Sequence, residues 1–595
     1  MRRLASPGFQ RSALIGSILT PSKEMLIEFK GLNRKSYTEQ GEMPDMLNLT
    51  SDEYPLLAPR KLRGLYKMPE GLVRPLQILS RYNKLAIIGT DANNDVNFYY
   101  DGVKIDAVND LNASSGMTAI NTKIVFMPQK TYLEIFPSGT GYTIGNYGSL
   151  EANVTCAGTA IDISGDYAKI TLQAGHGLKY DDAIKIEGTL AYTAGGQSKT
   201  AAANTSLTID SVENDNTIVF PKEVFIELIG EGATNVTLTG NISRTMPDLD
   251  HIIEWNNRLW GASNADNTIY ACKLGDPTNW QYFQGTSIDS FYAQQGTDGR
   301  WSGVAAYSGH VIFFKPHGMC RVYGTAPSNF QVTSTKCFGV EEGSRLSVVT
   351  INDTVYYKST IGIMAYAGGN PVCISENLGQ DFGNVVAGSE GIKYYASVQR
   401  KTAHGGFEVL VFDIDRGLWH KEDNVRFKGS CAIENKLHFI EYNEPELLCS
   451  ESIYASPYLV MGDSNKPGNI RIINSDDPDE QPDGESAMGE EEQMEHLEWM
   501  AQFGPFHEYL EEKKIYSKLA LRLKANAKSV VKVYMSIDDG EWELVKMYDF
   551  AATGGEVIPI IPRRCDRYSI RIEGKGDCEI VSLTRRVRQG TFSKL

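Results

Sequence analysis

Two short segments combine Asp, Gly and Trp in an order found both in tight hairpins and in some sugar-cleaving enzymes. Ser536-Ile-Asp-Asp-Gly-Glu-Trp542 comes close to an Asp-box, but its Trp stands one residue early and the motif occurs once. Asp413-Ile-Asp-Arg-Gly-Leu-Trp419 is a similar segment. Asp and Gly suit a tight turn, and the Trp can pack against the returning strand. We therefore interpret both segments as hairpins, with a calcium or glycan site as the alternative.

No other set of reactive side chains has the spacing of a catalytic or metal site. The sequence lacks GxSxG, HExxH, Walker and GxGxxG motifs, and its nine histidines form no pair at i, i+2 or i, i+4. His176 stands between two glycines with no ligand partner nearby, so we interpret it as a turn residue. The nine cysteines form no CxxC pair, which favours buried thiols in a reducing compartment. We predict no catalytic residue, no metal and no cofactor.

The elements that position these residues are predicted to be strands. The chain has 595 residues, 42% of them apolar and 22% charged, which excludes wholesale disorder. Short runs rich in Val, Ile and Tyr alternate with clusters of Gly, Asn and Asp, which predicts a mainly β protein. No stretch of about 18 apolar residues is present, so we expect no transmembrane helix. The short apolar run near the N-terminus has no small-residue cleavage site after it, which disfavours a signal peptide.

A polar turn followed by a hydrophobic strand recurs seven times along the chain. The copies start at residues 82, 121, 256, 308, 352, 391 and 434, and every step but one lies between 39 and 52 residues. A period of about 40 to 45 residues with several strands per unit is typical of a β-propeller blade. Blades must stack in a ring, because one blade cannot bury both faces of its sheet. We predict a β-propeller of about seven blades. Six or eight blades, or a set of unrelated β-sandwiches, are the alternatives.

The remaining regions differ from the repeats in pattern. The one long step, of 135 residues, predicts an inserted domain, and β alternation resumes after residue 514 as a compact sandwich. The first 75 residues are irregular, and we expect them to wrap over the propeller or over a neighbouring subunit. The predicted organisation is an N-terminal irregular arm at 1–75, a β-propeller at 76–450, a small β domain inserted at 148–245, an acidic linker that could form a short helix at 451–513, and a C-terminal β-sandwich at 514–595.

The charge of the chain is concentrated in one segment. The net charge is −16, and residues 473–512 hold fourteen acids and no Lys or Arg. Without that segment, 60 acids face 58 bases, so the rest of the chain is close to neutral. The segment is interpreted as a solvated linker, with a surface that repels nucleic acid as the alternative.

Several phrases carry a family resemblance. They are Phe29-Lys-Gly-Leu-Asn33, Gly41-Glu-Met-Pro-Asp-Met-Leu-Asn-Leu49, Tyr54-Pro-Leu-Leu-Ala-Pro-Arg60, Trp255-Asn-Asn-Arg-Leu-Trp-Gly261, Leu274-Gly-Asp-Pro-Thr-Asn-Trp280, Phe338-Gly-Val-Glu-Glu-Gly-Ser344 and Gly362-Ile-Met-Ala-Tyr366. Together they resemble phage virion proteins of the tail-hub or nozzle type, also called packaged-DNA stabilisation proteins. The likeness covers most of residues 25–450, and its motifs are structural rather than catalytic.

The resemblance implies a virion structural protein that forms a ring in a phage tail or neck and lines or gates the DNA channel. The implied partners are copies of the chain itself, with a hexamer expected, other tail, adaptor or portal proteins, and genome DNA in transient contact. The implied location is the virion, after synthesis in the host bacterial cytoplasm. The alternative is a peripheral tail or baseplate protein that binds host-surface glycan. A glycan-cleaving tail enzyme would need a carboxylate pair, which the sequence does not display.

Three expectations follow from this reading. Deleting residues 149–245 should leave a folded propeller, because the deletion restores a step of about 40 residues between repeats. The mildly basic N-terminal arm should gain order only against a partner and should mediate assembly. The channel surface should be acidic or neutral and should not hold DNA tightly, because a conduit rich in Lys and Arg would retain the genome. The basic run Arg585, Arg586 and Arg588 is interpreted as a docking edge for a neighbouring ring.

Overall fold

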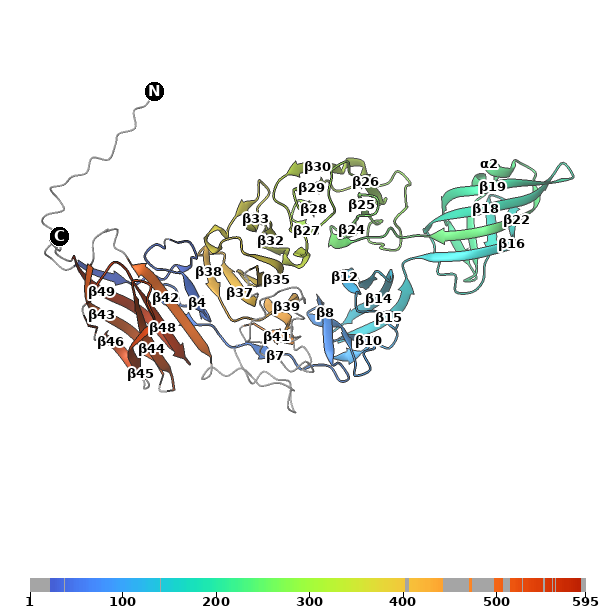
Figure 1. Ribbon diagram of the computed structural model, residues 1–595. Helices are drawn as coiled ribbons and strands as arrows, with labels where there is room; N and C mark the ends of the chain where they lie inside the picture. The colour runs from blue at the N-terminus through green and yellow to red at the C-terminus, as the bar shows by residue number, and fades with distance from the viewer. Residues whose placement is uncertain are drawn as a thin grey trace, which may run out of the picture. The chain divides into compact units, whose positions relative to one another are not determined.

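The computed structural model describes residues 22–36, 38–139, 141–401, 406–441, 470–473, 497–506, 514–526, 528–548, 552–558, 560–561 and 563–589. Within them the chain is mainly β, as expected from the sequence, and it divides into two compact units (Figure 1). We call Met68–Val372 with Lys428–Ile433 the first unit, and Met1–Lys67, Cys373–Phe427 and Glu434–Leu595 the second unit. None of the helices in the described ranges has the length and apolar character needed to cross a membrane.

The first unit contains four-stranded antiparallel sheets in which consecutive strands are neighbours, the arrangement from which propeller blades are built. The first two are β8 (Arg74–Arg81), β9 (Lys84–Thr90), β10 (Val96–Tyr100) and β11 (Val103–Lys104), then β12 (Gly116–Ile120), β13 (Lys123–Met127), β14 (Thr131–Ser138) and β15 (Gly141–Ser149). The next are β23 (His251–Trp255), β24 (Arg258–Ser263), β25 (Thr268–Ala271) and β26 (Phe291–Gln294), then β27 (Gly303–Tyr307), β28 (His310–Lys315), β29 (Gly318–Tyr323) and β30 (Gln331–Lys336), and finally β31 (Val349–Ile351), β32 (Thr354–Ser359), β33 (Gly362–Tyr366) and β34 (Val372–Cys373).

The recurring sequence phrase is a two-residue hairpin in four of the sheets. Both residues of each turn have positive φ, between 45° and 64°, which matches the twist of the flanking strands. Asn and Asp adopt this conformation more readily than other side chains do. The four turns are Tyr82-Asn83, Asn256-Asn257, Asn352-Asp353 and Glu434-Asn435.

Consecutive sheets of the first unit share apolar clusters. Phe98 of β10 and Phe126 of β13 lie in one cluster, with ring centroids 5.1 Å apart. A second cluster joins Val125 to Leu259, and a third joins Trp260 to Phe313. The first four sheets of this unit therefore bury apolar faces against one another, which is the physical reason that one such sheet would not be stable alone.

The segment between β15 and β23 of the first unit is here called the insertion (Figure 1). It forms one sheet of order β19-β18-β22-β16-β17-β21-β20, and its buried core includes Ile170, Ile186, Phe220 and Leu238. Its elements are β16 (Ala152–Ser164), β17 (Tyr167–Thr171), β18 (Ala183–Ala194), β19 (Gln197–Thr208), β20 (Ser211–Glu213), β21 (Thr217–Pro221), α2 (Glu223–Ile229) and β22 (Thr234–Arg244).

The second unit contains another four-stranded meander and two larger sheets. The meander is β35 (Phe382–Glu390), β36 (Lys393–Arg400), β37 (Gly406–Asp413) and β38 (Leu418–Lys421). The sheet of order β1-β49-β43-β46, with β47 beside β43, comprises β1 (Ser22–Leu26), β49 (Cys578–Gln589), β43 (Lys514–Ala525), β46 (Ala552–Ile558) and β47 (Arg564–Cys565). The sheet of order β4-β42-β48-β44-β45 comprises β4 (Asp45–Leu47), β42 (Glu498–Phe506), β48 (Tyr568–Lys575), β44 (Val530–Ile537) and β45 (Glu543–Tyr548).

One more sheet has the order β39-β40-β41-β7 and consists of β39 (Phe427–Ile433), β40 (Lys436–Glu441), β41 (Ile470–Ile472) and β7 (Gly64–Leu65). The described residues thus form seven four-stranded sheets. Two short pairs complete the list of strands, β2 (Gly31–Leu32) with β3 (Glu42–Met43) and β5 (Leu49–Thr50) with β6 (Ala58–Pro59).

The segment boundaries differ from the sequence-based ones at both ends of the chain. Residues 1–75, expected to be irregular, include strands that belong to sheets formed with distant segments: β1 pairs with β49, β4 with β42, and β7 with β41. Residues 451–513, expected to be a linker with a short helix, contribute β41 and β42, so Trp499 and Met500 lie in a strand and not in a helix. The rest of residues 451–513, namely 451–469, 474–496 and 507–513, lies outside the described residues. The strands β1, β4, β7 and β41 have five residues or fewer, which is too little alternation to be recognised locally.

Candidate functional site

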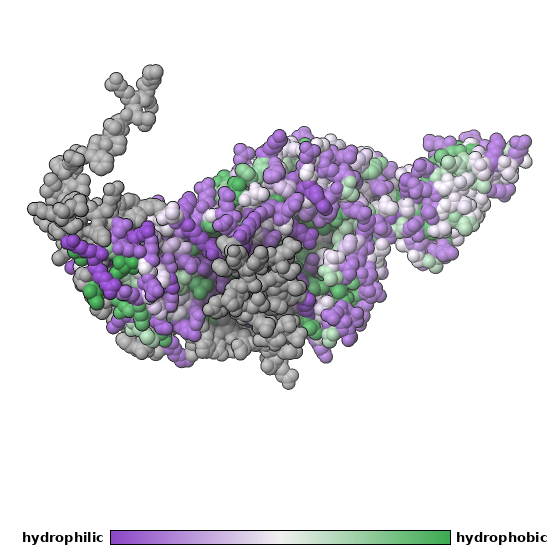
Figure 2. Space-filling view, in the orientation of Figure 1, coloured by the Kyte–Doolittle hydropathy of each residue, from purple (hydrophilic) through white to green (hydrophobic). Residues whose placement is uncertain are grey.

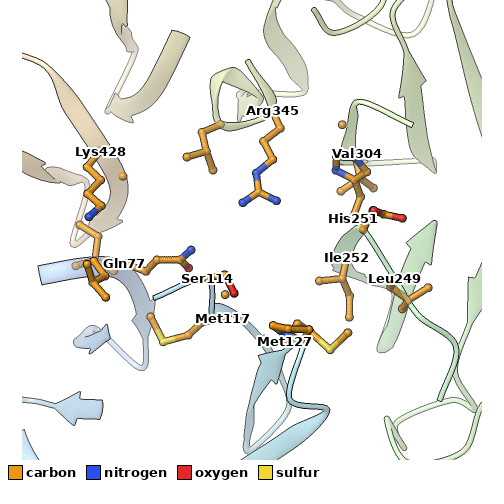
Figure 3. Close-up of a pocket in the computed structure, with 18 of the residues that line it drawn as sticks. Gln77, Ser114, Met117, Met127, Leu249, His251, Ile252, Val304, Arg345 and Lys428 are labelled. Carbon is orange, nitrogen blue, oxygen red and sulfur yellow. The ribbon is translucent and has the colours of Figure 1, made fainter. Parts of the chain in front are cut away.

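A cavity of about 460 Å³ opens in the first unit, where the first strands of several sheets converge (Figure 3). Its wall combines apolar side chains, such as Met117, Met127 and Ile252, with the polar Gln77 and Ser114. The strands β8, β12, β23, β27 and β39 contribute to it, together with the 3-10 turn η2 (Arg345–Ser347). A cavity of this size and mixed character is typical of a small-molecule site.

The charged side chains in this wall are mainly basic. Figure 3 shows the Arg345 guanidinium pointing into the cavity, with Lys428 on the wall. The single carboxylate in the described lining, Asp250, accepts a hydrogen bond from the Asn264 backbone N–H at 2.7 Å and so is engaged in a local turn. His251 Nε2 lies 3.0 Å from the Trp301 carbonyl oxygen, and burial together with nearby Arg345 lowers the pKa of His251, which keeps the imidazole neutral. The described lining, with Arg345 and Lys428 against Asp250, therefore carries a net positive charge.

Arg345 is held by one of the motifs that the sequence analysis singled out. The segment Phe338–Ser344 leads directly into η2. Within this segment, Glu341 pairs with the fully buried Lys358 at 2.7 Å. Ser347 Oγ donates to the Ser344 carbonyl at 2.6 Å, and both serines are fully buried. The ion pair of the buried Lys358 and the buried turn of Ser344 and Ser347 fix the backbone from which Arg345 projects.

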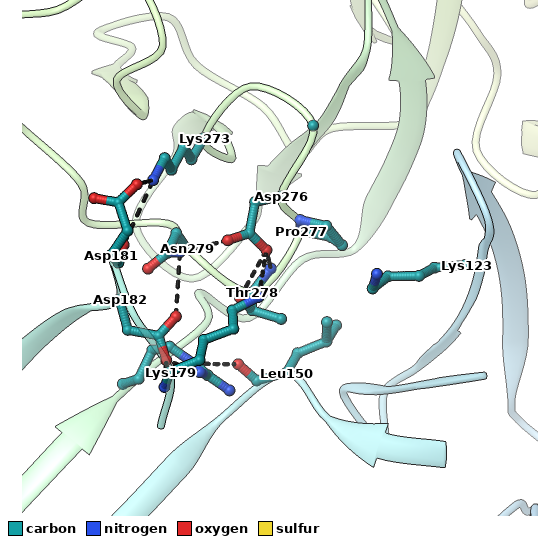
Figure 4. A network of polar contacts seen from close by, with 12 residues as sticks. Lys123, Leu150, Lys179, Asp181, Asp182, Lys273, Asp276, Pro277, Thr278 and Asn279 are labelled. Carbon is teal, nitrogen blue, oxygen red and sulfur yellow. Dashed lines mark hydrogen bonds and ion pairs between the residues drawn. The ribbon is translucent and has the colours of Figure 1, made fainter. Parts of the chain in front are cut away.

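A second polar cluster joins the insertion to the loop between β25 and β26 (Figure 4). Asp182 and Arg244, both buried, form an ion pair at the base of the insertion, and Asp181 pairs with Lys273. Asn279 Oδ1 accepts a hydrogen bond from the Ala183 backbone N–H at 2.8 Å. Charged groups buried this deeply persist only when paired, so the cluster anchors the insertion.

The Leu274–Trp280 motif supplies the other side of this anchor. Burial alone would raise the pKa of Asp276, but Lys179 and Thr278 hold it below its ordinary value, so the carboxylate is charged. Lys179 Nζ lies 3.3 Å from Asp276 Oδ1, and the Thr278 hydroxyl donates to the same oxygen at 2.7 Å. Trp280 Nε1–H donates to the Pro277 carbonyl at 2.7 Å. The motif is a buried turn rather than a reactive group.

The Trp255–Gly261 motif is structural as well. The buried guanidinium of Arg258 donates to the backbone carbonyls of Cys272 and Ser287 at 2.7 and 2.9 Å, and also to that of Asp289. Trp260 is fully buried between two sheets. Arg258 therefore crosslinks the backbone of its own sheet and the following loop.

In the second unit, Ser51, Asp413 and His420 come together although they are far apart in the sequence. Ser51 Oγ lies 2.5 Å from Asp413 Oδ2 and 3.0 Å from His420 Nε2. Burial would raise the pKa of Asp413, but hydrogen bonds from Ser51 and Arg416 hold it below its ordinary value, whereas burial lowers the pKa of His420 to about 4. Because the Ser51 proton goes to Asp413, His420 donates to the hydroxyl and cannot act as its base. All three side chains are buried, so this is a packing cluster and not a nucleophilic triad.

The other residues marked in the sequence are also part of local structure. The Leu178 backbone N–H donates to His176 Nδ1 at 3.0 Å, as in a turn, and the described residues contain no group of His, Cys, Asp and Glu that could hold a metal ion. Asp538 accepts hydrogen bonds from the Asp566 and Arg567 backbone at 2.7 and 3.0 Å. Eight cysteines are described and all are free thiols.

The basic residues near the two ends of the chain are engaged within the second unit. Arg34 makes a bidentate pair with Glu408 at 2.6 and 2.7 Å. Arg585 is buried, pairs with Glu24 and lies over the Phe506 ring at 3.7 Å, so the basic run 585–588 is not a uniform exposed edge. Arg586 is exposed, whereas the side chain of Arg588 is outside the described part.

Comparison with known proteins assigns no family. No family model and no curated protein matches the chain. Among solved structures, Hsv2 of Kluyveromyces lactis is 12% identical, with 41% of this chain and 66% of that chain covered and a TM-score of 0.25. The exo-β-1,3-galactanase of Phanerochaete chrysosporium is 9% identical over 88% of this chain and 100% of that chain, with a TM-score of 0.21. Apo AztD of Citrobacter koseri is 10% identical over 61% and 93%, with a TM-score of 0.24. Likenesses this low carry no functional argument.

Proposed function

We propose that this protein is a non-catalytic structural component of a phage virion, which forms a ring in the tail or neck and lines or gates the DNA channel. The proposal depends on the structural role of the motifs that resemble tail-hub proteins. The segments that resemble tail-hub proteins, including Trp255–Gly261, Leu274–Trp280 and Phe338–Ser344, are built from buried guanidinium, carboxylate and indole groups that hold backbone together. Motifs used in this way suit a protein whose shape is its function.

The proposed architecture is a β-propeller of about seven blades, with the insertion as a small β domain and a C-terminal β-sandwich. Seven four-stranded sheets among the described residues support the blade count. The proposed partners are further copies of the chain in a hexameric ring, other tail, adaptor or portal proteins, and genome DNA in passing. The described lining of the cavity holds one carboxylate, whereas hydrolysis of a glycosidic bond generally requires two.

The proposal is tested by asking whether the protein forms rings and whether it is present in phage particles. Purified protein should form uniform rings in negative-stain micrographs, and peptides of the chain should be found by mass spectrometry in purified phage particles. A protein that stays monomeric at all accessible concentrations and is absent from particles would overturn the proposal.

DNA binding gives an independent test of the conduit role. Apart from residues 473–512 the chain is nearly neutral, so no net basic field favours tight retention of phosphates. We expect only weak, non-specific duplex binding near physiological salt. Sub-micromolar affinity with a steep salt dependence would instead indicate a protein that anchors DNA.

A second candidate function is binding of host-surface glycan. Apolar residues form small groups among hydrophilic ones on the face shown in Figure 2. Exposed aromatic rings include Tyr180 and Tyr292, which are 67% and 61% exposed, and Phe283, whose ring centroid lies 5.7 Å from that of Tyr292. Exposed aromatic rings can stack on sugar faces. Saturable binding on a glycan array that is lost in Tyr292→Ala would support this function, and an array without signal would remove it.

A further inference from the structure

We propose that the cavity of the first unit binds a small organic anion, whose carboxylate or phosphate head pairs with Arg345. The inference is independent of the proposed ring function. It assigns a class of ligand to a cavity that has no part in the proposed structural function.

The first step of the argument is the state of Arg345. The side chain is exposed within the cavity and forms no hydrogen bond or ion pair with any described residue. Other arginines of the first unit, such as Arg244 and Arg258, are buried and fully engaged with carboxylate or carbonyl oxygens. Arg345 thus differs from them, because its guanidinium donors face the cavity rather than the protein.

The second step is that the protein orients this side chain. The turn that carries Arg345 is fixed by the buried Lys358–Glu341 pair and by the buried Ser347 hydroxyl. A cation presented from a rigid turn loses little freedom when it pairs with a ligand, which is how preorganised sites gain affinity. A planar guanidinium can bind a carboxylate or a phosphate through two parallel hydrogen bonds.

The third step is the surroundings of the head group. Lys428 adds a second positive charge, and the carboxylate of Asp250 is directed to the Asn264 backbone N–H. Met117, Met127 and Ile252 form an apolar surface in the same cavity. A cavity with low-dielectric walls and a net positive charge concentrates anions. The wall therefore suits a ligand with an anionic head and an apolar body.

Calorimetric titration of the full chain tests the proposal. The probes are phenyl phosphate and benzoate, which share one ring, inorganic phosphate, and benzyl alcohol as the neutral analogue. We expect saturable binding of at least one ring-bearing anion, weaker binding of inorganic phosphate, and no binding of the alcohol. The relative affinities of phenyl phosphate and benzoate identify the preferred head group. Failure of every anion to bind overturns the proposal.

Arg345→Ala should weaken binding about 10-fold or more, since a charged hydrogen-bond pair is lost. Lys336→Ala is the matched control, because it removes an exposed cation from the outer strand β30 and should leave the affinity unchanged. Equal affinity in Arg345→Ala and the unaltered protein would overturn the assignment. Arg345→Gln, checked by thermal melting, keeps the test valid if the alanine variant is unstable.

Histidine NMR provides a second readout of location. His251 senses Arg345 electrostatically, so an anion bound at Arg345 should shift the His251 ring signal, which is assigned by its absence in His251→Gln. The shift should vanish in Arg345→Ala. Binding that leaves this signal unmoved in the unaltered protein would place the ligand elsewhere and refute the site.

Discussion

The insertion and the N-terminal segment, residues 22–67, are both attached to a four-stranded sheet of their own unit, but by different means. The insertion has a core of its own, and its attachment is concentrated in one cluster around Asp182 and Arg244. The N-terminal segment contributes only short strands and is held along its length by ion pairs to β36–β38 and the residues that follow. Those pairs are Arg34–Glu408, Lys421–Asp45, Lys393–Asp52, Arg63–Glu422 and Arg60–Asp423.

This difference in attachment indicates which of the two segments can be deleted without unfolding the rest of its unit. A domain that buries its own apolar side chains folds without its neighbour, whereas a segment without a core has to take its stability from the surface that it covers. Of the two sequence-based alternatives for the N-terminal arm, residues 22–67 follow the first, because they pack against sheets of their own chain. The role of the arm in assembly stays a prediction.

The largest effect is expected from truncating residues 1–65. The truncation removes Arg60 and Arg63, which pair with the buried Glu422, and it removes Ser51 from its cluster with Asp413 and His420. Leaving one such carboxylate buried and unpaired costs about 3–5 kcal/mol, which is a large share of the stability of a typical domain. We expect insoluble protein or loss of the cooperative melting of the second unit. A truncated chain that melts like the full chain would contradict this account.

A point variant isolates one contact of the N-terminal segment. Arg34→Ala should lower the free energy of unfolding by about 2 kcal/mol, because Glu408 is almost fully buried, loses two hydrogen bonds and keeps only Arg400 at 3.5 Å. The neighbouring Lys35 is exposed, and Lys35→Ala should change the value by less than about 0.5 kcal/mol. Chemical denaturation of both variants, compared side by side, measures the difference.

For the insertion, breaking the anchor should cost more than removing the domain. Asp182→Ala leaves the Arg244 guanidinium buried without its carboxylate, with an expected loss of about 3–5 kcal/mol. Deleting residues 152–244 removes both partners, and a short linker can close the gap, because Ala152 and Arg244 are register partners. Leu150 and Met246 must stay, since both belong to a core cluster with Trp280.

The deletion variant should remain soluble and melt cooperatively, in agreement with the expectation drawn from the repeat spacing. Thermal melting of the deletion variant and of Asp182→Ala, measured together, gives the order of the two effects. If the deletion proves the more damaging, the insertion is integral to the first unit.

Lowering the pH is expected to reduce the stability of the folded chain by an intermediate amount. Burial lowers the pKa of His420 and of His310 to about 4, below the value of about 6.5 for an unfolded histidine. The unfolded chain therefore takes up protons first, and stability is lost as the pH falls from about 6.5 to about 4, by about 3 kcal/mol for each buried histidine. His420→Gln should flatten this dependence in the second unit and His310→Gln in the first. Melting curves recorded across this range check both, and an unchanged slope would show that the imidazoles are not neutral.

The smallest effect is expected on the outer face of the insertion. Lys169 pairs with Glu213 at 2.8 Å, but both side chains are partly exposed. Screening by solvent limits such pairs to less than about 1 kcal/mol, so Lys169→Ala should barely change the melting temperature. A loss comparable with that of Asp182→Ala would show that surface charge, and not the buried anchor, stabilises the domain.

The sequence alone determined the local features. Asn256-Asn257 and Asn352-Asp353 were recognisable as turns between strands because the positive φ that such turns require is tolerated best by Asn, Asp and Gly. Period-two alternation indicated mainly β structure, and the one long step between repeats indicated an insertion at 148–245, where the structure has a seven-stranded sheet. These properties depend on neighbouring residues, so they can be read without the fold.

Only the tertiary structure decided which residues meet. Arg34 and Glu408 are separated by 374 positions and Ser51 and His420 by 369, and nothing in either local sequence marks the pair. The cavity is assembled in the same way, from Gln77, His251, Arg345 and Lys428, each of which is ordinary in its own segment. The strands of the N-terminal segment escaped prediction because they are stabilised by distant partners rather than by their own alternation. Burial and pairing of charge are properties of the folded chain, and they decide whether a charged residue is an anchor or an open binding group.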